Sequence, residues 1–171
     1  CRKNYNCRRC ARIHQQPRKI ILKKRVVITG EGSISPLGHN SQSLWENLVK
    51  GKSGIDHISS FDTENFSIKI AGEVKDFDPN NFFEAKEARK LDRFTMFGLI
   101  AAEQALQNSN YKSSDAGVIV GTGVGGMHTL EEEHQKLIKK GQRGVSPFYV
   151  PKMIPNICLL YTSDAADETT G

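Results

Sequence analysis

The chain has 171 residues and a mass of 19.0 kDa, which is the size of one ordinary domain. Hydrophobic residues make up 37% of it and charged residues 25%, a composition typical of a globular protein. No apolar run approaches the ~20 residues that a membrane span needs, so we expect no such span. Residues 1–25 hold ten of the 24 Lys and Arg residues and none of the 19 Asp and Glu residues. The head of the chain is therefore basic and the rest acidic, which predicts that they differ in origin.

The first 23 residues contain a candidate metal site. Cys7 and Cys10 form a C-x-x-C pair, and Cys1 and His14 would complete a set of four zinc ligands. The spacing is cramped and no second Cys/His pair follows, so we predict no metal site. The many basic groups are also typical of a nucleic-acid-binding module. A disordered basic arm is the plainer interpretation, because the segment has almost no apolar periodicity.

Short β-branched runs at 25–30 and 116–120 predict two buried strands, each followed by glycines. Asn40 or Ser41 is placed to cap a helix that Gly51 ends. Residues 67–74 predict an exposed strand, and Asp78-Pro79 begins another helical region.

Residues 84–109 predict the longest helix. Its middle is apolar nearly all round, which indicates burial in a core. Lys86, Arg89 and Lys90 follow i, i+3, i+4 spacing and would share one face of its first turns. Such a face is either simply solvated or a docking patch for an acidic partner.

Residues 121–126 match the G-x-G-x-x-G pattern of dinucleotide-binding loops. The pattern favours a Rossmann-type nicotinamide-dependent oxidoreductase as an alternative function. Such a site needs a strand that ends in an acid about 20 residues on, and the chain has none there. A helix is expected from Met127, and its Glu131–His134 stretch indicates a solvent-facing surface more than a metal or acid–base site. Residues 145–151 are expected to be extended.

The alternation of strands and helices predicts an α/β layered domain. Six stretches follow one another along residues 24–157: RVVITGEGSISPLG, KSGIDHISSFDT, AGEVKDFDP, EARKLDRFTMFGLIAAEQAL, GVIVGTGVGGMHTLEEEH and SPFYVPKMIPNI. In this order and spacing, they resemble the N-terminal part of a β-ketoacyl-acyl carrier protein synthase of the type II elongating kind.

The resemblance implies an incomplete thiolase-like fold, whose full form is an αβαβα stack in a homodimer. It also implies the condensation of an acyl chain with malonyl-acyl carrier protein through an acyl-cysteine, with no cofactor and no metal. The family's nucleophilic Cys, two His and Lys would all lie past Ile157, so no catalytic residue carries over. The five histidines match none of the catalytic ones: His14, His39, His57, His128 and His134.

Three supporting roles do carry over from the resemblance. Val124 matches a residue that lines the acyl pocket, and Phe148 or Tyr149 matches the segment that reaches toward the partner subunit's pocket. The strip of Lys86, Arg89 and Lys90 matches basic residues that receive the acidic acyl carrier protein. A cytoplasmic location is expected from the same resemblance.

The segments outside 24–157 are expected to be foreign to the natural protein. With one permitted set of codons, a one-nucleotide shift of frame turns residues 2–21 into a sequence like the last helix of an acyl carrier protein. Residues 1–23 are thus interpreted as out-of-frame upstream sequence or a disordered basic arm. Residues 158–171 resemble a translated sequencing adapter, so Cys158 is not expected to act as a nucleophile.

Overall fold

The computed structural model describes residues 25–111 and 116–158, and its regular elements are mostly helical. The sequence-derived zinc set and basic head at 1–23, and nearly all of the proposed tail, lie outside these residues. The elements follow one another as α2 (Ser41–Val49), β1 (Asp56–His57), β2 (Ile70–Ala71), the 3-10 turn η1 (Pro79–Asn81), α3 (Ala85–Ala88), α4 (Arg93–Ser109), α5 (Met127–Lys140), the 3-10 turn η2 (Gln142–Gly144) and α6 (Tyr149–Met153).

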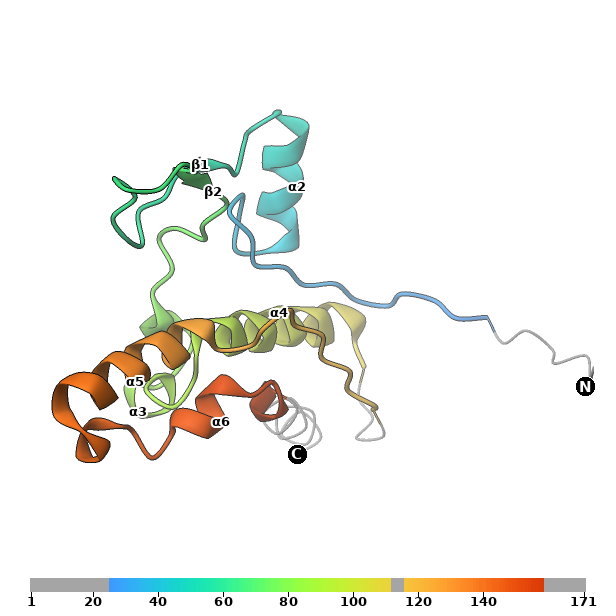
Figure 1. The fold of residues 1–171 in the computed structure, drawn as a ribbon. Coiled ribbons are helices and arrows are strands. Elements are labelled where there is room, and N and C mark those ends of the chain that lie inside the picture. Colours follow the sequence, from blue (N-terminus) through green and yellow to red (C-terminus); the bar gives the residue numbers. More distant parts are fainter. Residues whose placement is uncertain (1–24, 112–115, 159–171) are drawn as a thin grey trace, which may run out of the picture.

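The long helix α4 runs across the middle of the molecule (Figure 1). Helices α3, α5 and α6 gather around its N-terminal end, while α2 and the β1–β2 pair form a separate group on its other side. No helix in the described part of the chain has the length and apolar character required to cross a membrane.

Local sequence signals predict two of the helices well. Asn40 caps α2 by accepting a 2.8 Å hydrogen bond from the Ser43 N–H, and Gly51 follows the helix with a φ of 68°. Helix α5 begins at Met127, as its position after the glycine loop predicts. Both expectations are therefore confirmed.

The predicted helix over residues 84–109 is wrong as one continuous element. Asp92 is extended, with φ −84° and ψ 160°, and its side chain accepts a hydrogen bond from the Phe94 N–H at the start of α4. An Asp side chain that bonds the backbone in this way competes with the helix it would otherwise continue. The chain therefore forms the one-turn helix α3, a link over residues 89–92, and then α4.

The predicted strands at 25–30 and 116–120 are also wrong, because neither forms a strand. Val26, Ile28 and Ile119 are 93%, 91% and 98% exposed. In the described chain, β1 and β2 form the whole sheet, an antiparallel pair with Asp56 opposite Ala71. The predicted strand over 67–74 is confirmed only at Ile70 and Ala71. A β-branched run becomes a strand only where a neighbouring strand supplies hydrogen bonds.

Residues 145–151 are not extended throughout, because Tyr149 starts α6. The Tyr149 N–H bonds the Ser146 carbonyl at 3.1 Å, and the Phe148 N–H bonds the Ser146 hydroxyl at 3.2 Å. Pro151 lies in the first turn of α6, where its missing N–H has no helical partner to lose.

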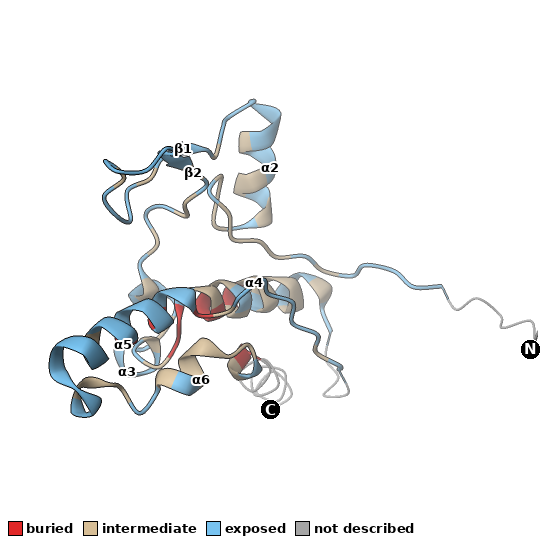
Figure 2. Ribbon diagram, viewed as in Figure 1, coloured by how far each residue is buried: buried red, intermediate tan, exposed pale blue. Residues whose placement is uncertain are grey.

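The core is small and lies where α4, the start of α5 and the link before α4 meet (Figure 2). Its buried apolar residues are Leu91, Met96, Ile100 and Cys158. Four polar residues are buried with them: Asp92, Thr95, Thr129 and Glu133. An unusually large share of this core is therefore polar, which makes its hydrogen bonds decisive for the geometry.

The segment before α2 lies directly against α4. The Ser33 N–H donates to Gln104 Oε1 at 3.1 Å, and the Asn108 amide donates to the Glu31 carbonyl at 2.9 Å. Side chains at Gly30 and Gly32 would overlap the carbonyl oxygens of α4. The two glycines are therefore required by this close backbone approach.

Candidate functional site

One buried carboxylate joins the starts of two helices. Asp92 Oδ1 accepts from the Phe94 N–H at 3.3 Å, which caps α4. Its Oδ2 accepts from the Thr129 N–H at 3.2 Å and also from the Thr129 hydroxyl, in the first turn of α5. No salt bridge to Asp92 is found within 25–111 and 116–158. Because helix N-termini are partially positive, the two helices supply the favourable field instead.

The glycine loop is fixed at its end by the same region. Gly125 has a φ of 81°, and the Gly126 N–H donates to the Met153 carbonyl at 2.9 Å. A Cβ at Gly126 would lie 2.8 Å from the Lys152 carbonyl oxygen and 3.0 Å from Asp92 Oδ2. These glycines therefore allow close packing of the loop between Asp92 and α6. Val124 directly precedes them and is 70% exposed.

The segment that leads into α6 is tied to α5 by a second buried carboxylate. Glu133 accepts a 2.6 Å hydrogen bond from the Ser146 N–H and a 2.7 Å bond from the Lys136 ammonium. The ammonium of Lys136 first, and the Ser146 N–H second, lower the pKa of Glu133. Two residues later Phe148 is 45% exposed, and Tyr149 is half-buried.

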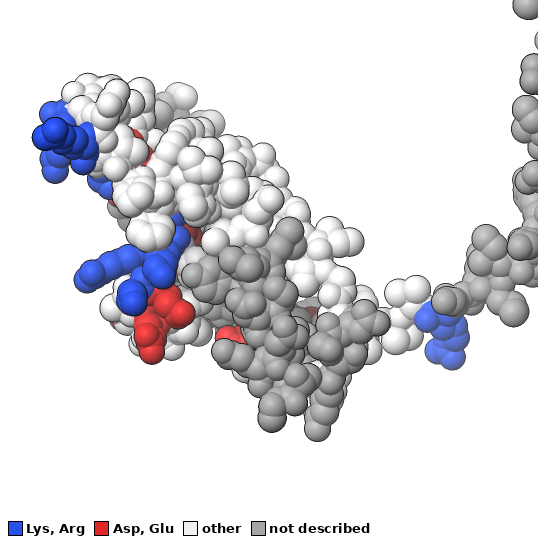
Figure 3. Space-filling model, turned by 90° about the horizontal axis from the view of Figure 1, so that it is seen from below, with Lys and Arg blue, Asp and Glu red and all other residues white. Residues whose placement is uncertain are grey.

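The basic strip, which comprises Lys86, Arg89 and Lys90, does not lie along one helix. Only Lys86 belongs to α3, and Arg89 is the C-cap residue of that helix. Lys90 follows in a turn, in which its own N–H donates to the Glu87 carbonyl at 2.8 Å. Lys86 and Arg89 are exposed, whereas Lys90 is half-buried. Glu84 precedes the strip and Glu87 lies within it. On the face that Figure 3 shows from below, basic and acidic side chains lie next to each other.

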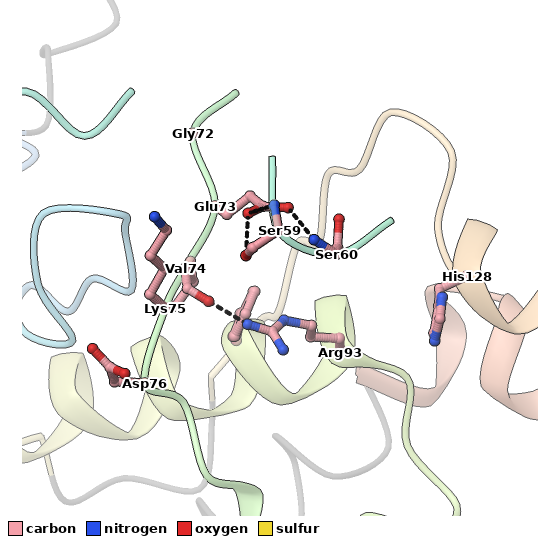
Figure 4. A pocket seen from close by; sticks show the side chains of 10 residues that line it. Ser59, Ser60, Gly72, Glu73, Val74, Lys75, Asp76, Arg93 and His128 are labelled. Atoms are coloured by element: carbon pink, nitrogen blue, oxygen red, sulfur yellow. Dashed lines mark hydrogen bonds between the residues drawn. The ribbon is translucent and has the colours of Figure 1, made fainter. Parts of the chain in front are cut away.

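A pocket of about 740 Å³ lies between the segments that follow β1 and β2 and helices α4 and α5. Arg93 and His128, the sequence neighbours of Asp92 and Thr129, both line it (Figure 4). The Arg93 guanidinium donates to the Val74 carbonyl and lies 5.2 Å from the Phe97 ring centre. Arg93, the first residue of α4, therefore bonds the segment 72–76 to this helix.

The charged side chains of Glu73 and Lys75, which line this pocket, already form hydrogen bonds or ion pairs with other residues of the chain. Glu73 accepts from the N–H and hydroxyl of Ser59, both at 2.8 Å, and from the Ser60 N–H at 3.1 Å. Hydrogen bonds from Ser60 and Ser59 lower the pKa of Glu73 to about 2. Lys75 pairs with Asp56 at 2.6 Å, which raises the pKa of Lys75 and lowers that of Asp56. These charged groups are already used to hold the loop.

The acidic stretch of α5 is solvent-facing only in part. Glu131, Glu132 and His134 are exposed as predicted, but Glu133 is buried because it bonds Ser146. His128 lies 3.2 Å from Glu132 one turn away. The described residues contain no group of three His, Cys, Asp or Glu side chains arranged to hold a metal ion.

Two residues that sequence reasoning missed, Asp92 and Thr129, hold this region together. They are 37 positions apart, so no local pattern connects them. The one available signal was Asp92 itself, a good N-cap residue immediately before the apolar stretch of α4. The structure also places Lys90 of the basic strip 6.0 Å from the ring centre of Phe148, which sequence alone did not predict.

The model of the β-ketoacyl synthase N-terminal domain matches residues 23–159, so the chain belongs to this family. A curated relative, 3-oxoacyl-[acyl-carrier-protein] synthase 2 of Staphylococcus aureus (strain N315), is 45% identical over 139 residues. That match covers 78% of this chain and 34% of the relative, so the chain spans about a third of the curated relative's length.

Solved structures agree on the fold. The ishigamide ketosynthase/chain length factor matches with a TM-score of 0.70 and 25% identity, over 82% of this chain and 36% of that one. A type II PKS ketosynthase, solved in complex with its acyl-carrier protein, matches with a TM-score of 0.66 and 23% identity. This match covers 85% of this chain and 39% of the ketosynthase chain. The expected partial thiolase-like α/β fold is therefore confirmed, and neither the oxidoreductase nor the nucleic-acid alternative finds support.

Proposed function

We propose that residues 24–157 form the N-terminal part of a fatty-acid-elongating 3-oxoacyl-acyl carrier protein synthase. The observation that carries the proposal is the 45% identity to the Staphylococcus aureus synthase over almost the whole of this segment. We further propose that the full-length synthase, in which these residues are followed by the rest of the family's chain, is a cytoplasmic homodimer. Residues 1–23 and 158–171 are proposed to lie largely outside this domain, of which the family model matches 23–159.

The proposed reaction is a decarboxylative Claisen condensation. An acyl chain first forms a thioester with a cysteine beyond Ile157, and this attack releases the first carrier's thiol. Loss of CO₂ from malonyl-carrier protein leaves an enolate, whose carbon attacks the acyl-cysteine carbonyl. The carbon–sulfur bond breaks, the thiolate is regenerated, and 3-oxoacyl-carrier protein is the product. A thiolate near a helix N-terminus and donors aimed at the oxyanion would favour these steps.

The described residues contribute binding surfaces to this reaction. Val124 is proposed to line the acyl pocket, since it is exposed and directly precedes Gly125 and Gly126, the closely packed end of the glycine loop. Phe148 and Tyr149 are proposed to reach toward the partner subunit's pocket. The basic strip is proposed to receive an acyl carrier protein, a partner with which one structural relative was solved.

The test is a product assay on the full-length synthase. We expect acyl-carrier and malonyl-carrier protein to yield 3-oxoacyl-carrier protein and an equal amount of CO₂, with no nicotinamide cofactor required. An enzyme that is folded and dimeric but forms neither product under these conditions would contradict the proposal.

A further inference from the structure

Three candidates outside the proposed roles stand out in the structure: the pocket of Figure 4, the unpaired apolar segments, and the Asp92–Thr129 contact. The pocket's charged groups already bond one another, and the apolar segments have nothing on them that identifies a partner. The Asp92–Thr129 contact is different, because it joins the chain two residues after Lys90 of the basic strip to the chain three residues after Gly126 of the glycine loop.

We infer that Asp92 is a positioning residue that sets the acyl-chain-length preference of the synthase by holding the glycine loop in place. This inference rests on the proposed function, since it takes Val124 as a lining residue of the acyl pocket. Asp92 itself is not a pocket-lining residue, because it is 6% exposed and its two carboxylate oxygens accept hydrogen bonds from the backbone of α4 and α5.

The connection from Asp92 to Val124 has two short steps. Asp92 Oδ2 fixes the first turn of α5 through Thr129, which is 4% exposed. Gly126 is the N-cap residue of that helix, and its N–H is bonded to the Met153 carbonyl. Val124 lies two residues before Gly126, so the start of α5 sets the point from which the chain reaches Val124. Gly126 is packed against Lys152, Met153 and Asp92, whereas Gly121 and Gly123 have open space around them, so the loop is anchored at this end.

The carboxylate has no good substitute at this position. It accepts three hydrogen bonds with two oxygens, and a neutral Asn offers one acceptor oxygen and an NH₂ donor. In Asp92→Asn, either the α4 cap or the Thr129 N–H therefore loses its acceptor. The loop end then samples more than one position, and the pocket discriminates less sharply between chain lengths.

The test measures kcat/KM of the full-length synthase for a series of acyl-carrier substrates from short to long. One methylene in an apolar pocket is worth roughly 10-fold to 200-fold in specificity. We expect the ratio between the best and the poorest chain length to fall about threefold or more in Asp92→Asn. Thr129→Val, which removes only the hydroxyl, should lower the ratio in the same direction, and Thr129→Ser should restore it. The double variant Asp92→Asn with Thr129→Val should lower the chain-length ratio little further than Asp92→Asn alone.

Asn40→Ala is the control, because it removes the side-chain cap of another helix, α2, and this cap has no bond to the glycine loop among the described residues. It should leave the chain-length ratio unchanged. An unchanged ratio in folded Asp92→Asn, or in Thr129→Val if Asp92→Asn does not fold, would overturn the inference. A wild-type enzyme that forms no 3-oxoacyl product would instead contradict the proposed function, so the two failures are distinguishable.

Discussion

The ammonium of Lys90 lies 6.0 Å from the centre of the Phe148 ring, within the range of a cation–π contact. Lys90 belongs to the basic strip and Phe148 to the segment that leads into α6, so the contact joins two proposed functional surfaces. Lys90 therefore differs from Lys86 and Arg89, which are exposed and have no cation–π contact among the described residues. Electrostatic docking and local packing can therefore be tested with different substitutions.

Reversing Lys86 and Arg89 to Glu in the full-length synthase should strongly raise KM for carrier-linked substrates. In the proposed docking, attraction between the acidic carrier and this strip acts over a Debye length of about 10 Å at 0.1 M salt. Pantetheine thioesters need no protein docking, so their KM should change little. Stability should change by only ~0.5 kcal/mol for each exposed substitution.

The control for this double variant is Lys139→Glu with Lys140→Glu at the exposed end of α5, which makes the same change in net charge. It should leave both substrate classes nearly unaffected. If the strip variant and this control raise KM equally, a general charge effect explains the result and the docking proposal fails. The docking proposal would also fail if the strip variant raised KM equally for carrier-linked and pantetheine substrates.

Val124→Phe should shorten the acyl chains that the full-length synthase accepts. The added ring occupies space at the end of the glycine loop, and overpacking of an apolar site typically costs ~1–3 kcal/mol. The measurement is kcat/KM across acyl-carrier substrates of increasing length. Val124→Ala, which makes the residue smaller, should not shorten the range. An unchanged profile for Val124→Phe would show that this residue does not line the pocket.

Glu133→Gln should destabilise the protein at neutral pH. The substitution weakens the bond to the Lys136 ammonium and to the Ser146 N–H at a buried position, and a hydrogen bond to a charged group is worth about 1.5–3 kcal/mol. Glu131→Gln is the matched control because Glu131 is exposed on the same helix, and it should cost less than about 0.5 kcal/mol. Denaturant unfolding measures both. Equal costs would mean that the Glu133 contacts contribute nothing.

Glu73 should make the Ser59–Ser60 loop sensitive to acid. Its folded pKa of about 2 lies below the ordinary 4.5, so its stabilising contribution is present above pH 4.5 and is lost as pH falls toward 2. Hydrogen exchange of peptides that contain Ser59 and Ser60 measures this directly. Glu73→Gln should lower their protection at pH 7, and the difference from wild type should be much smaller near pH 2, where about half of the Glu73 carboxylate is protonated.

The exposed Glu64 in the same loop supplies the control, because no hydrogen bond to its carboxylate is found among the described residues. Glu64→Gln should leave protection unchanged at every pH. A difference between wild type and Glu73→Gln that persists undiminished at pH 2 would contradict the assigned role of the carboxylate.

Sequence reasoning succeeded where the determining signal was local. The cap at Asn40 and the glycines before Met127 lie within a few residues of the helices they start. It failed at 25–30 and 116–120, since pairing of strands depends on partners elsewhere in the fold. It also missed the break at Asp92, where a side-chain cap overrides a residue pattern that suits a helix.

The candidate site divides in the same way. The family resemblance suggested Val124, Phe148 and the basic strip, because these positions lie in recognisable motifs. It did not suggest that Asp92 binds Thr129, or that Lys90 contacts Phe148, since both contacts bring together residues far apart in the chain. Such pairs are defined by packing, and a single sequence contains no direct signal for them.

The most direct test of the account is to locate the acyl group after incubation with acyl-carrier protein alone. Intact mass and peptide mapping of the full-length synthase should show one acyl chain per subunit, in thioester linkage to a cysteine that follows the segment matching residues 24–157 and is distinct from Cys158. The 171-residue chain under the same conditions should remain unmodified at Cys1, Cys7, Cys10 and Cys158. Acylation of Cys158 in that chain, or an unmodified full-length synthase, would contradict the claim that these residues belong to an acyl-cysteine condensing enzyme and only bind its substrates.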